Sequence, residues 1–270
     1  MTNFLWCTVT LLLLVSSAQK VIAEDEDPLR RALRATVQIV IRDSANTVRG
    51  TGSGVLVSHD GYILTAKHVI EDYYKSPEST SILVRILDGN LTLRPEQIAE
   101  AVSRDPNVDM ALIRVTGEKF PFLRIGNSSM VKIDEQLVAF GFERSGGKWL
   151  TKSGRRNGLN WEVDIPLFPG SSGGPVVKSG CDMLVGIVVG GLEDPITKAL
   201  IPGRSQILPS QFGAFVLGYG ASTQSAKLCD SMVESPLHSP TPNRPPTSPC
   251  KEITVSETVN GVTTWAKKCL

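Results

Sequence analysis

The chain has 270 residues, of which 41% are hydrophobic, 6% aromatic and 20% charged, and its formal net charge is +1. This length is enough for one large domain of the β-barrel type. The nearly neutral charge gives no electrostatic reason to expect nucleic acid or another acidic polymer as a partner, and the few aromatic residues offer no stacking platform for single strands.

The N-terminus carries an apolar run, Phe4–Val15, that is short for a membrane span and typical of the central region of a signal peptide. Small residues follow at 16–18, and Val21-Ile22-Ala23 offers a second cleavage site. We expect a signal peptide at 1–23, export to the periplasm or the extracellular space, and no stable membrane span. An uncleaved anchor is the alternative, because residues 1–3 carry no Lys or Arg.

Next along the chain, Pro28–Ala35 has the pattern of a short amphipathic helix, and Pro209–Gly218 that of a C-terminal helix. Between them, turn signals such as Asp60-Gly61 separate many short segments rich in β-branched or alternating apolar residues. This pattern predicts an all-β, antiparallel sandwich or barrel and not a βαβ fold. The expected strands are Val37–Ile41, Gly54–Val57, Tyr62–Ala66, Ser81–Leu87, Met110–Val115, Gln136–Phe142, Pro175–Lys178 and Leu184–Val189.

Composition changes after about residue 220. Six prolines within Ser235–Pro249 indicate a polyproline-like linker. The β-prone segment Ile253–Trp265 is interrupted by Asn260-Gly261, a strong signal for a two-residue hairpin turn. We therefore expect a main domain at 24–220 and a Pro-rich, Cys-containing tail at 221–270.

Four cysteines would remain after loss of Cys7 with the signal peptide. An even number in an exported protein favours disulfides, and the absence of a C-x-x-C spacing disfavours a zinc site, so we expect no metal and no cofactor. Three connectivities are possible. We predict a Cys250–Cys269 bond that closes the hairpin and a Cys181–Cys229 bond that ties the following segment to the main domain.

Three further positions together suggest nucleophilic catalysis: Ser172 between glycines on a tight turn, His68 after an apolar segment, and Asp109 before one. A serine needs an adjacent base, and a histidine needs a carboxylate to orient it. The backbone N–H groups of Gly170 and Ser172 would point at one oxyanion. Each residue alone is more often structural, so the combination and its order carry the interpretation.

Four segments resemble the trypsin-like serine proteases, and within them the HtrA/Deg branch: Gly52–Val57, Asp60–Val69, Val108–Ile113 and Asp164–Pro175. The resemblance covers roughly residues 34–215. It implies two perpendicular, six-stranded antiparallel β-barrels with the catalytic triad in the cleft between them.

The chain also departs from that family. The tail is too short and Pro-rich for the PDZ domain that usually follows in HtrA-like proteins. Ser171 replaces the Asp used in activation by N-terminal clipping, so that route is not expected. Val189 lies where secretory members have a serine that bonds the catalytic Asp, which leaves the second oxygen of Asp109 without an identified partner.

The resulting functional expectation is an exported serine endopeptidase acting on polypeptides, unfolded proteins among them. The substrate main chain would pair with Val189, Gly190 and Gly191, and Phe168 would limit the primary pocket. Pro166 stands where a trypsin-type pocket has its carboxylate, which predicts cleavage after small or medium apolar residues. A catalytically silent or activator-dependent fold used as a binding module, and an esterase, are the alternatives.

Overall fold

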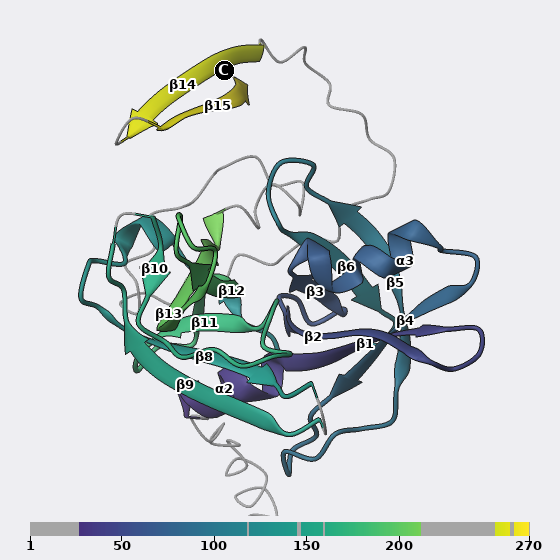
Figure 1. The fold of residues 1–270 in the computed structure, drawn as a ribbon. Coiled ribbons are helices and arrows are strands. Elements are labelled where there is room, and N and C mark those ends of the chain that lie inside the picture. Colours follow the sequence, from purple (N-terminus) through teal and green to yellow (C-terminus); the bar gives the residue numbers. More distant parts are fainter. Residues whose placement is uncertain are drawn as a thin grey trace, which may run out of the picture. The chain divides into compact units, whose positions relative to one another are not determined.

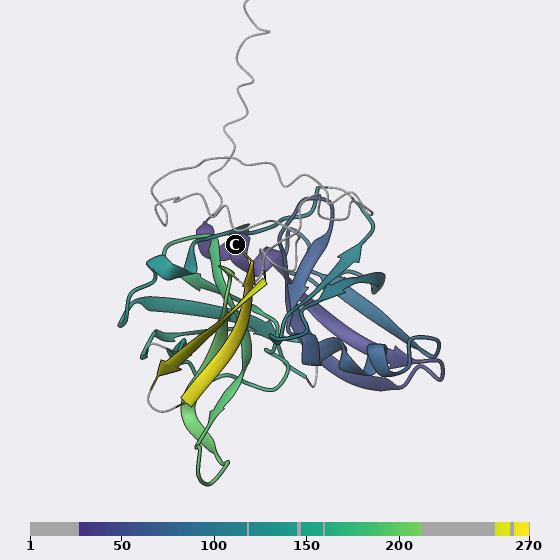
Figure 2. The same ribbon diagram turned by 90° about the horizontal axis from the view of Figure 1, so that it is seen from above.

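The computed structural model describes residues 27–117, 119–144, 147–158 and 160–211, and the backbone of two strands at 252–259 and 262–269. Contacts divide the chain into two compact units, 1–236 and 237–270, which we describe separately. The first unit contains two β-barrels that lie side by side, the first in purple to blue and the second in teal to green (Figure 2).

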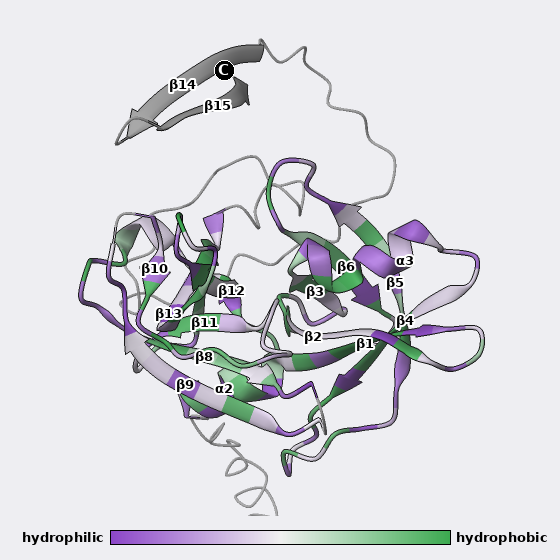
Figure 3. Ribbon diagram, viewed as in Figure 1, coloured by the Kyte–Doolittle hydropathy of each residue, from purple (hydrophilic) through white to green (hydrophobic). Residues whose placement is uncertain are grey.

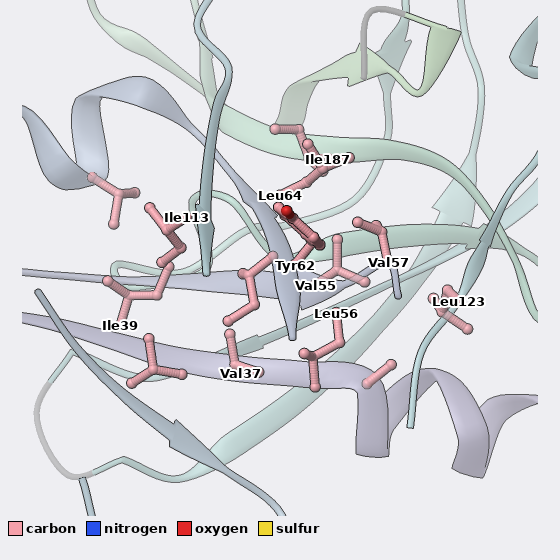
Figure 4. Close-up of a cluster of buried hydrophobic side chains, with 14 of the residues drawn as sticks. Val37, Ile39, Val55, Leu56, Val57, Tyr62, Leu64, Ile113, Leu123 and Ile187 are labelled. Atoms are coloured by element: carbon pink, nitrogen blue, oxygen red, sulfur yellow. The ribbon is translucent and has the colours of Figure 1, made fainter. Parts of the chain in front are cut away.

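The first barrel is closed and antiparallel, in the strand order β1-β2-β3-β6-β5-β4 (Figure 1). Closure removes the unpaired edges that an open sheet would expose. Its interior is filled by aliphatic side chains such as Ile39, Val55 and Ile113, none of them exposed (Figure 4). The strands are Thr36–Asp43, Val48–Leu56, Tyr62–Thr65, Thr80–Ile86, Gln97–Arg104 and Ala111–Val115 for β1 to β6. The 3-10 helix η1 (Lys67–Ile70) and the helix α3 (Glu71–Lys75) follow β3.

The second barrel has the strand order β10-β13-β12-β11-β8-β9, and a further short strand, β7, pairs parallel with β12. A bridge between Arg156 and Val163 joins the end of β9 to β10, supported by a 3.0 Å hydrogen bond from Asp164 N to Arg155 O. The fold is thus a closed six-stranded antiparallel barrel next to a second, seven-stranded and mainly antiparallel half-barrel, which fits the expected trypsin-like double barrel. Strands β7 to β13 are Arg124–Ile125, Gln136–Phe142, Trp149–Arg155, Glu162–Val163, Pro175–Lys178, Met183–Glu193 and Leu200–Pro209. A 3-10 helix, η2 (Ser128–Met130), follows β7.

Helix α2 (Pro28–Ala35) has the predicted bounds. The Asp27 carboxylate caps it by accepting a 3.3 Å hydrogen bond from Leu29 N, and its buried face joins the core. An ion pair between Arg31 and Asp182 ties the helix to the turn before β12. No helix in the described part of the chain is long and apolar enough to cross a bilayer.

All eight predicted strands are present, with ends that differ by a few residues. The strands that sequence reasoning missed, β5, β7, β9, β10 and β13, are either two residues long or largely exposed on one face. In Figure 3 the hydropathy is clear for β8, which is mainly hydrophobic, and for the hydrophilic α3. Pro209, where we expected a helix to begin, instead ends β13. Most of that expected helix, the signal peptide and the Pro-rich stretch lie outside the described residues.

The second unit contains the predicted hairpin. Strands β14 (Glu252–Val259) and β15 (Val262–Cys269) are antiparallel, with Val259 opposite Val262, so the turn is two residues long. Cys269 pairs with Glu252, and Cys250 lies outside the described residues, so the Cys250–Cys269 bond remains a prediction. In the first unit, Cys181 is buried and disulfide-bonded. Its pairing with Cys229, which also lies outside the described residues, remains a prediction too.

Arg156, which forms the bridge between the end of β9 and β10, generates a stability prediction. Its buried guanidinium donates to Val131 O and to Gly158 O, and lies 4.0 Å from the Trp161 ring centroid. Replacement by alanine would leave both carbonyls without this partner. We expect Arg156→Ala to lower the free energy of unfolding by about 2 to 3 kcal/mol, measured by urea denaturation. Lys152→Ala, at an exposed residue of β9, should change it by less than about 0.5 kcal/mol; equal effects would contradict the prediction.

Candidate active site

Ser172 lies in a tight loop, residues 168–174, between β10 and β11. The loop is held internally by Ser171, whose N–H and hydroxyl both donate to Phe168 O, at 3.1 and 2.7 Å. Gly170 and Gly173 adopt φ values of +101° and +83°. A Cβ at Gly173 would lie 2.2 Å from the backbone oxygen of Ser53. Conformation and space therefore both require glycine there.

His68 and Asp109 are brought together by the pairing of β3 with β6. Thr65 lies opposite Ala111, so the segment after β3 meets the segment before β6. His68 Nδ1 lies 2.6 Å from Asp109 Oδ2, and the His68 backbone N–H donates to Asp109 Oδ1 at 2.9 Å. The second carboxylate oxygen, which sequence reasoning left without a partner, is thus bound by the histidine's own backbone.

The electrostatics of Asp109 favour its charged form. Burial by itself raises the pKa of this carboxyl, but the hydrogen bonds from the His68 ring and backbone, and the charges of His68 and Lys67, lower it below its ordinary value. Lys67 also braces the loop that carries Asp109, because its Nζ donates to Asp105 O at 3.0 Å and to Pro106 O at 3.4 Å. We had assigned no role to Lys67 from the sequence. Its place directly before His68 was the only signal.

The Ser172 loop approaches the segment that carries His68, but the Ser172 hydroxyl is bonded elsewhere. Ser172 Oγ donates to Val189 O at 3.3 Å, and no hydrogen bond joins it to His68 within the described chain. Proximity is clear from Gly52, whose added Cβ would lie 2.5 Å from Val69, the residue after His68, and 3.1 Å from Ser172 O. The structure therefore joins His68 to Asp109 and sets Ser172 close by, with its hydroxyl turned to Val189.

The two proposed oxyanion donors have no acceptor among the described residues. The Pro169 carbonyl accepts a 3.0 Å hydrogen bond from Arg144 N. In a trans peptide the N–H points opposite to the C=O, so the Gly170 N–H faces away from Arg144. The Ser172 N–H is likewise without a hydrogen bond in that part of the chain, and both donors remain available to a ligand.

The predicted substrate-binding residues lie on β12 and in the loop. Val188, just before them, exchanges hydrogen bonds with the loop through Gly173 N and Gly174 O, at 2.7 and 2.9 Å. A Cβ at Gly190 would meet nothing within 4 Å, whereas one at Gly191 would lie 2.8 Å from Leu200. Phe168 is half-buried and belongs to neither hydrophobic cluster, which argues against a role in the core. Over the described residues, His, Cys, Asp and Glu form no group of three or more suited to a metal ion.

Comparisons with known proteins agree with the resemblance seen in the sequence. A family model described as a trypsin-like peptidase domain matches residues 52–187, about half of the chain. A Pseudomonas putida protein named "Probable periplasmic serine endoprotease DegP-like" is 33% identical over 144 residues, which cover 50% of this chain and 28% of that protein. A protein of the same name from Pseudomonas fluorescens is 34% identical over 158 residues, covering 55% and 30%. The chain therefore spans less than a third of the length of these curated relatives.

Among solved structures, the crystal structure of Deg5 matches with a TM-score of 0.53 and 20% sequence identity. The match covers 65% of this chain and 86% of that one. At this identity the likeness concerns the fold, and it agrees with the two-barrel architecture.

The lowered pKa of Asp109 generates a prediction about stability. A carboxyl whose folded-state pKa lies below its ordinary value of 3.8 stabilises the fold above that value and loses this contribution as the pH falls through the folded-state pKa. We expect Asp109→Asn to have a lower Tm than the wild type at neutral pH, and the difference to shrink below about pH 4. Thermal unfolding across that range measures it, with Glu100→Gln on the exposed face of β5 as the control. A difference that does not change with pH would contradict it.

Proposed function

This chain belongs to the trypsin-like peptidase domain family, and from that membership we propose that it is a serine endopeptidase that cleaves polypeptides through Ser172. The observation that carries the proposal is the 2.6 Å contact between His68 Nδ1 and Asp109 Oδ2 beside the Ser172 loop. An imidazole held in this way has its Nδ1 proton on the carboxylate side and its Nε2 free to accept a proton.

In the proposed reaction, Ser172 Oγ leaves the Val189 carbonyl and attacks the carbonyl carbon of the scissile bond, while His68 Nε2 accepts its proton. Asp109 stabilises the imidazolium that forms, and the N–H groups of Gly170 and Ser172 bind the oxyanion. His68 then gives the proton to the leaving amine. In the second half of the reaction water attacks the acyl-enzyme while His68 Nε2 accepts its proton, and His68 returns that proton to Ser172 Oγ as the acid product leaves.

The substrate main chain would add as a strand along Val189, Gly190 and Gly191, a mode that uses backbone hydrogen bonds for affinity. The open space beside Gly190 supports this. The relatives named as periplasmic serine endoproteases support export. The proposal also includes a signal peptide at 1–23, a peptidase domain at 24–220 and a tail at 221–270. Unfolded proteins are the substrate class we propose.

A second candidate function is favoured by one observation. The Ser172 hydroxyl donates to Val189 O and not to His68, which fits a protease that stays inactive until an activator or substrate binds. Labelling by a fluorophosphonate probe separates the two readings. Rapid labelling of the isolated mature chain supports constitutive activity, while labelling only after addition of an unfolded protein supports the activator-dependent form.

The triad generates the first activity prediction. Ser172→Ala, His68→Ala and Asp109→Asn should each lower kcat by about 10⁴-fold or more on an unfolded protein substrate, and the double variants should lose little more, because the residues act as a unit. His59→Ala is the matched control, since His59 is an exposed histidine whose nearest carboxylate oxygen, on Asp60, is 3.9 Å away. Wild-type turnover by Ser172→Ala would disprove the proposal.

The second activity prediction concerns the primary pocket. With Pro166 in place of a carboxylate, an unpaired Lys or Arg side chain would cost several kcal/mol, so we expect cleavage after Val, Ala, Ile or Leu. Phe168→Ala should admit larger residues, whereas Phe122→Ala, at a residue packed on the first barrel's core, should leave the preference unchanged. A peptide-library profile measures both. Dominance of Lys or Arg at the cleaved position would contradict the prediction.

A further inference from the structure

Ser53 is a fully buried residue of β2 in the first barrel, yet most of its polar contacts lie in the second barrel. Its hydroxyl donates to Gly170 O at 2.7 Å and accepts a hydrogen bond from Phe142 N at 2.9 Å. Its backbone N–H donates to Ser172 O at 2.7 Å. One residue therefore contacts both ends of the segment that carries the two oxyanion donors.

Ser53 also contacts the segment that leads to the histidine. The Thr65 hydroxyl donates to Ser53 O at 2.7 Å, and Thr65 is the last residue of β3, three residues before His68. The contacts of Ser53 thus reach the nucleophile loop, the strand before the general base, and β8 through Phe142.

From these contacts we propose that Ser53 is a positioning residue that sets the oxyanion hole. This inference rests on the proposed function. The Gly170 and Ser172 N–H groups lie in the peptides that precede these residues, and those peptides are held by Arg144 N–H on Pro169 O and by Gly174 N–H on Ser171 O. Ser53 bonds the next peptide along the chain in each case, through Gly170 O and Ser172 O, and so restrains the backbone torsions at Gly170 and Ser172.

The hydroxyl is the part of Ser53 that the proposal needs. A serine hydroxyl offers one donor and two acceptor positions, and here the donor serves Gly170 O and an acceptor serves Phe142 N–H. Alanine would keep the Cβ but leave the Gly170 carbonyl without this donor, so the Gly170–Ser171 peptide would be held only at its other end, by the Ser171 N–H bond to Phe168 O. Catalysis would then suffer more than substrate binding, because the oxyanion forms only in the transition state.

The test compares Ser53→Ala with Ser210→Ala in the full mature chain. Ser210 is the matched control, because it is also fully buried and its hydroxyl also donates to a backbone carbonyl, that of Gly126 at 2.8 Å, away from the loop. We expect Ser53→Ala to lower kcat by about 10- to 100-fold with KM little changed, and Ser210→Ala to leave kcat near the wild-type value. A structural role alone would lower Tm in both variants without separating their kcat values, and that result would overturn the proposal.

A second measurement separates this proposal from the proposed function. Amide hydrogen exchange of residues 168–174, followed by mass spectrometry, needs no turnover. Faster exchange there in Ser53→Ala than in Ser210→Ala supports the bracing role, even if the wild type cleaves no polypeptide, in which case only the proposed function fails. Equal exchange in the two variants overturns the bracing role. If Ser53→Ala does not fold, Ser53→Cys, which fills the same space with a weak donor, is measured in its place with the same expected and contrary results.

Discussion

The pairing of β3 with β6 is the constraint on which the arrangement of the site depends. Both strands are short, and their register is fixed because Tyr62–Thr65 and their partners on β6, apart from the half-buried Arg114, are buried. A shift of one residue would turn every side chain to the opposite face. The same register places the segment after β3 against the segment before β6, which is why a histidine and an aspartate far apart in sequence share two hydrogen bonds.

Strands with a buried, β-branched face were predictable from the sequence, and so was the helix that Asp27 caps. The missed strands lack that signal. In β5 the apolar residues Ile98 and Val102 are exposed, and in β9 polar residues occupy the exposed positions, so hydropathy does not separate either strand from loops. Near its start β13 carries Pro202 and Gly203, residues that usually mark turns, yet the strand pairs with β12 at Leu200 and again from Ser205.

At the site, sequence reasoning singled out Ser172, His68 and Asp109 because their types and order are unusual in combination. It could not identify partners that use the backbone. The second oxygen of Asp109 is bound by a main-chain N–H, a group that nearly every residue type carries. The identity of the residues therefore gives no sign of this contact. Ser53 was visible only as part of a Gly-Ser-Gly motif, since its role arises from contacts with another barrel.

The close contacts at Gly52 and Gly173 also limit which substitutions this sequence can accept during evolution. At Gly52 the atoms that would clash with an added methyl group belong mainly to the Val69 side chain. A smaller residue in place of Val69 would therefore make room for a side chain at position 52. At Gly173 the nearest obstacle is the Ser53 main-chain oxygen, which no replacement of side chains removes. In evolution Gly52 should therefore change only together with Val69, whereas Gly173 should remain glycine.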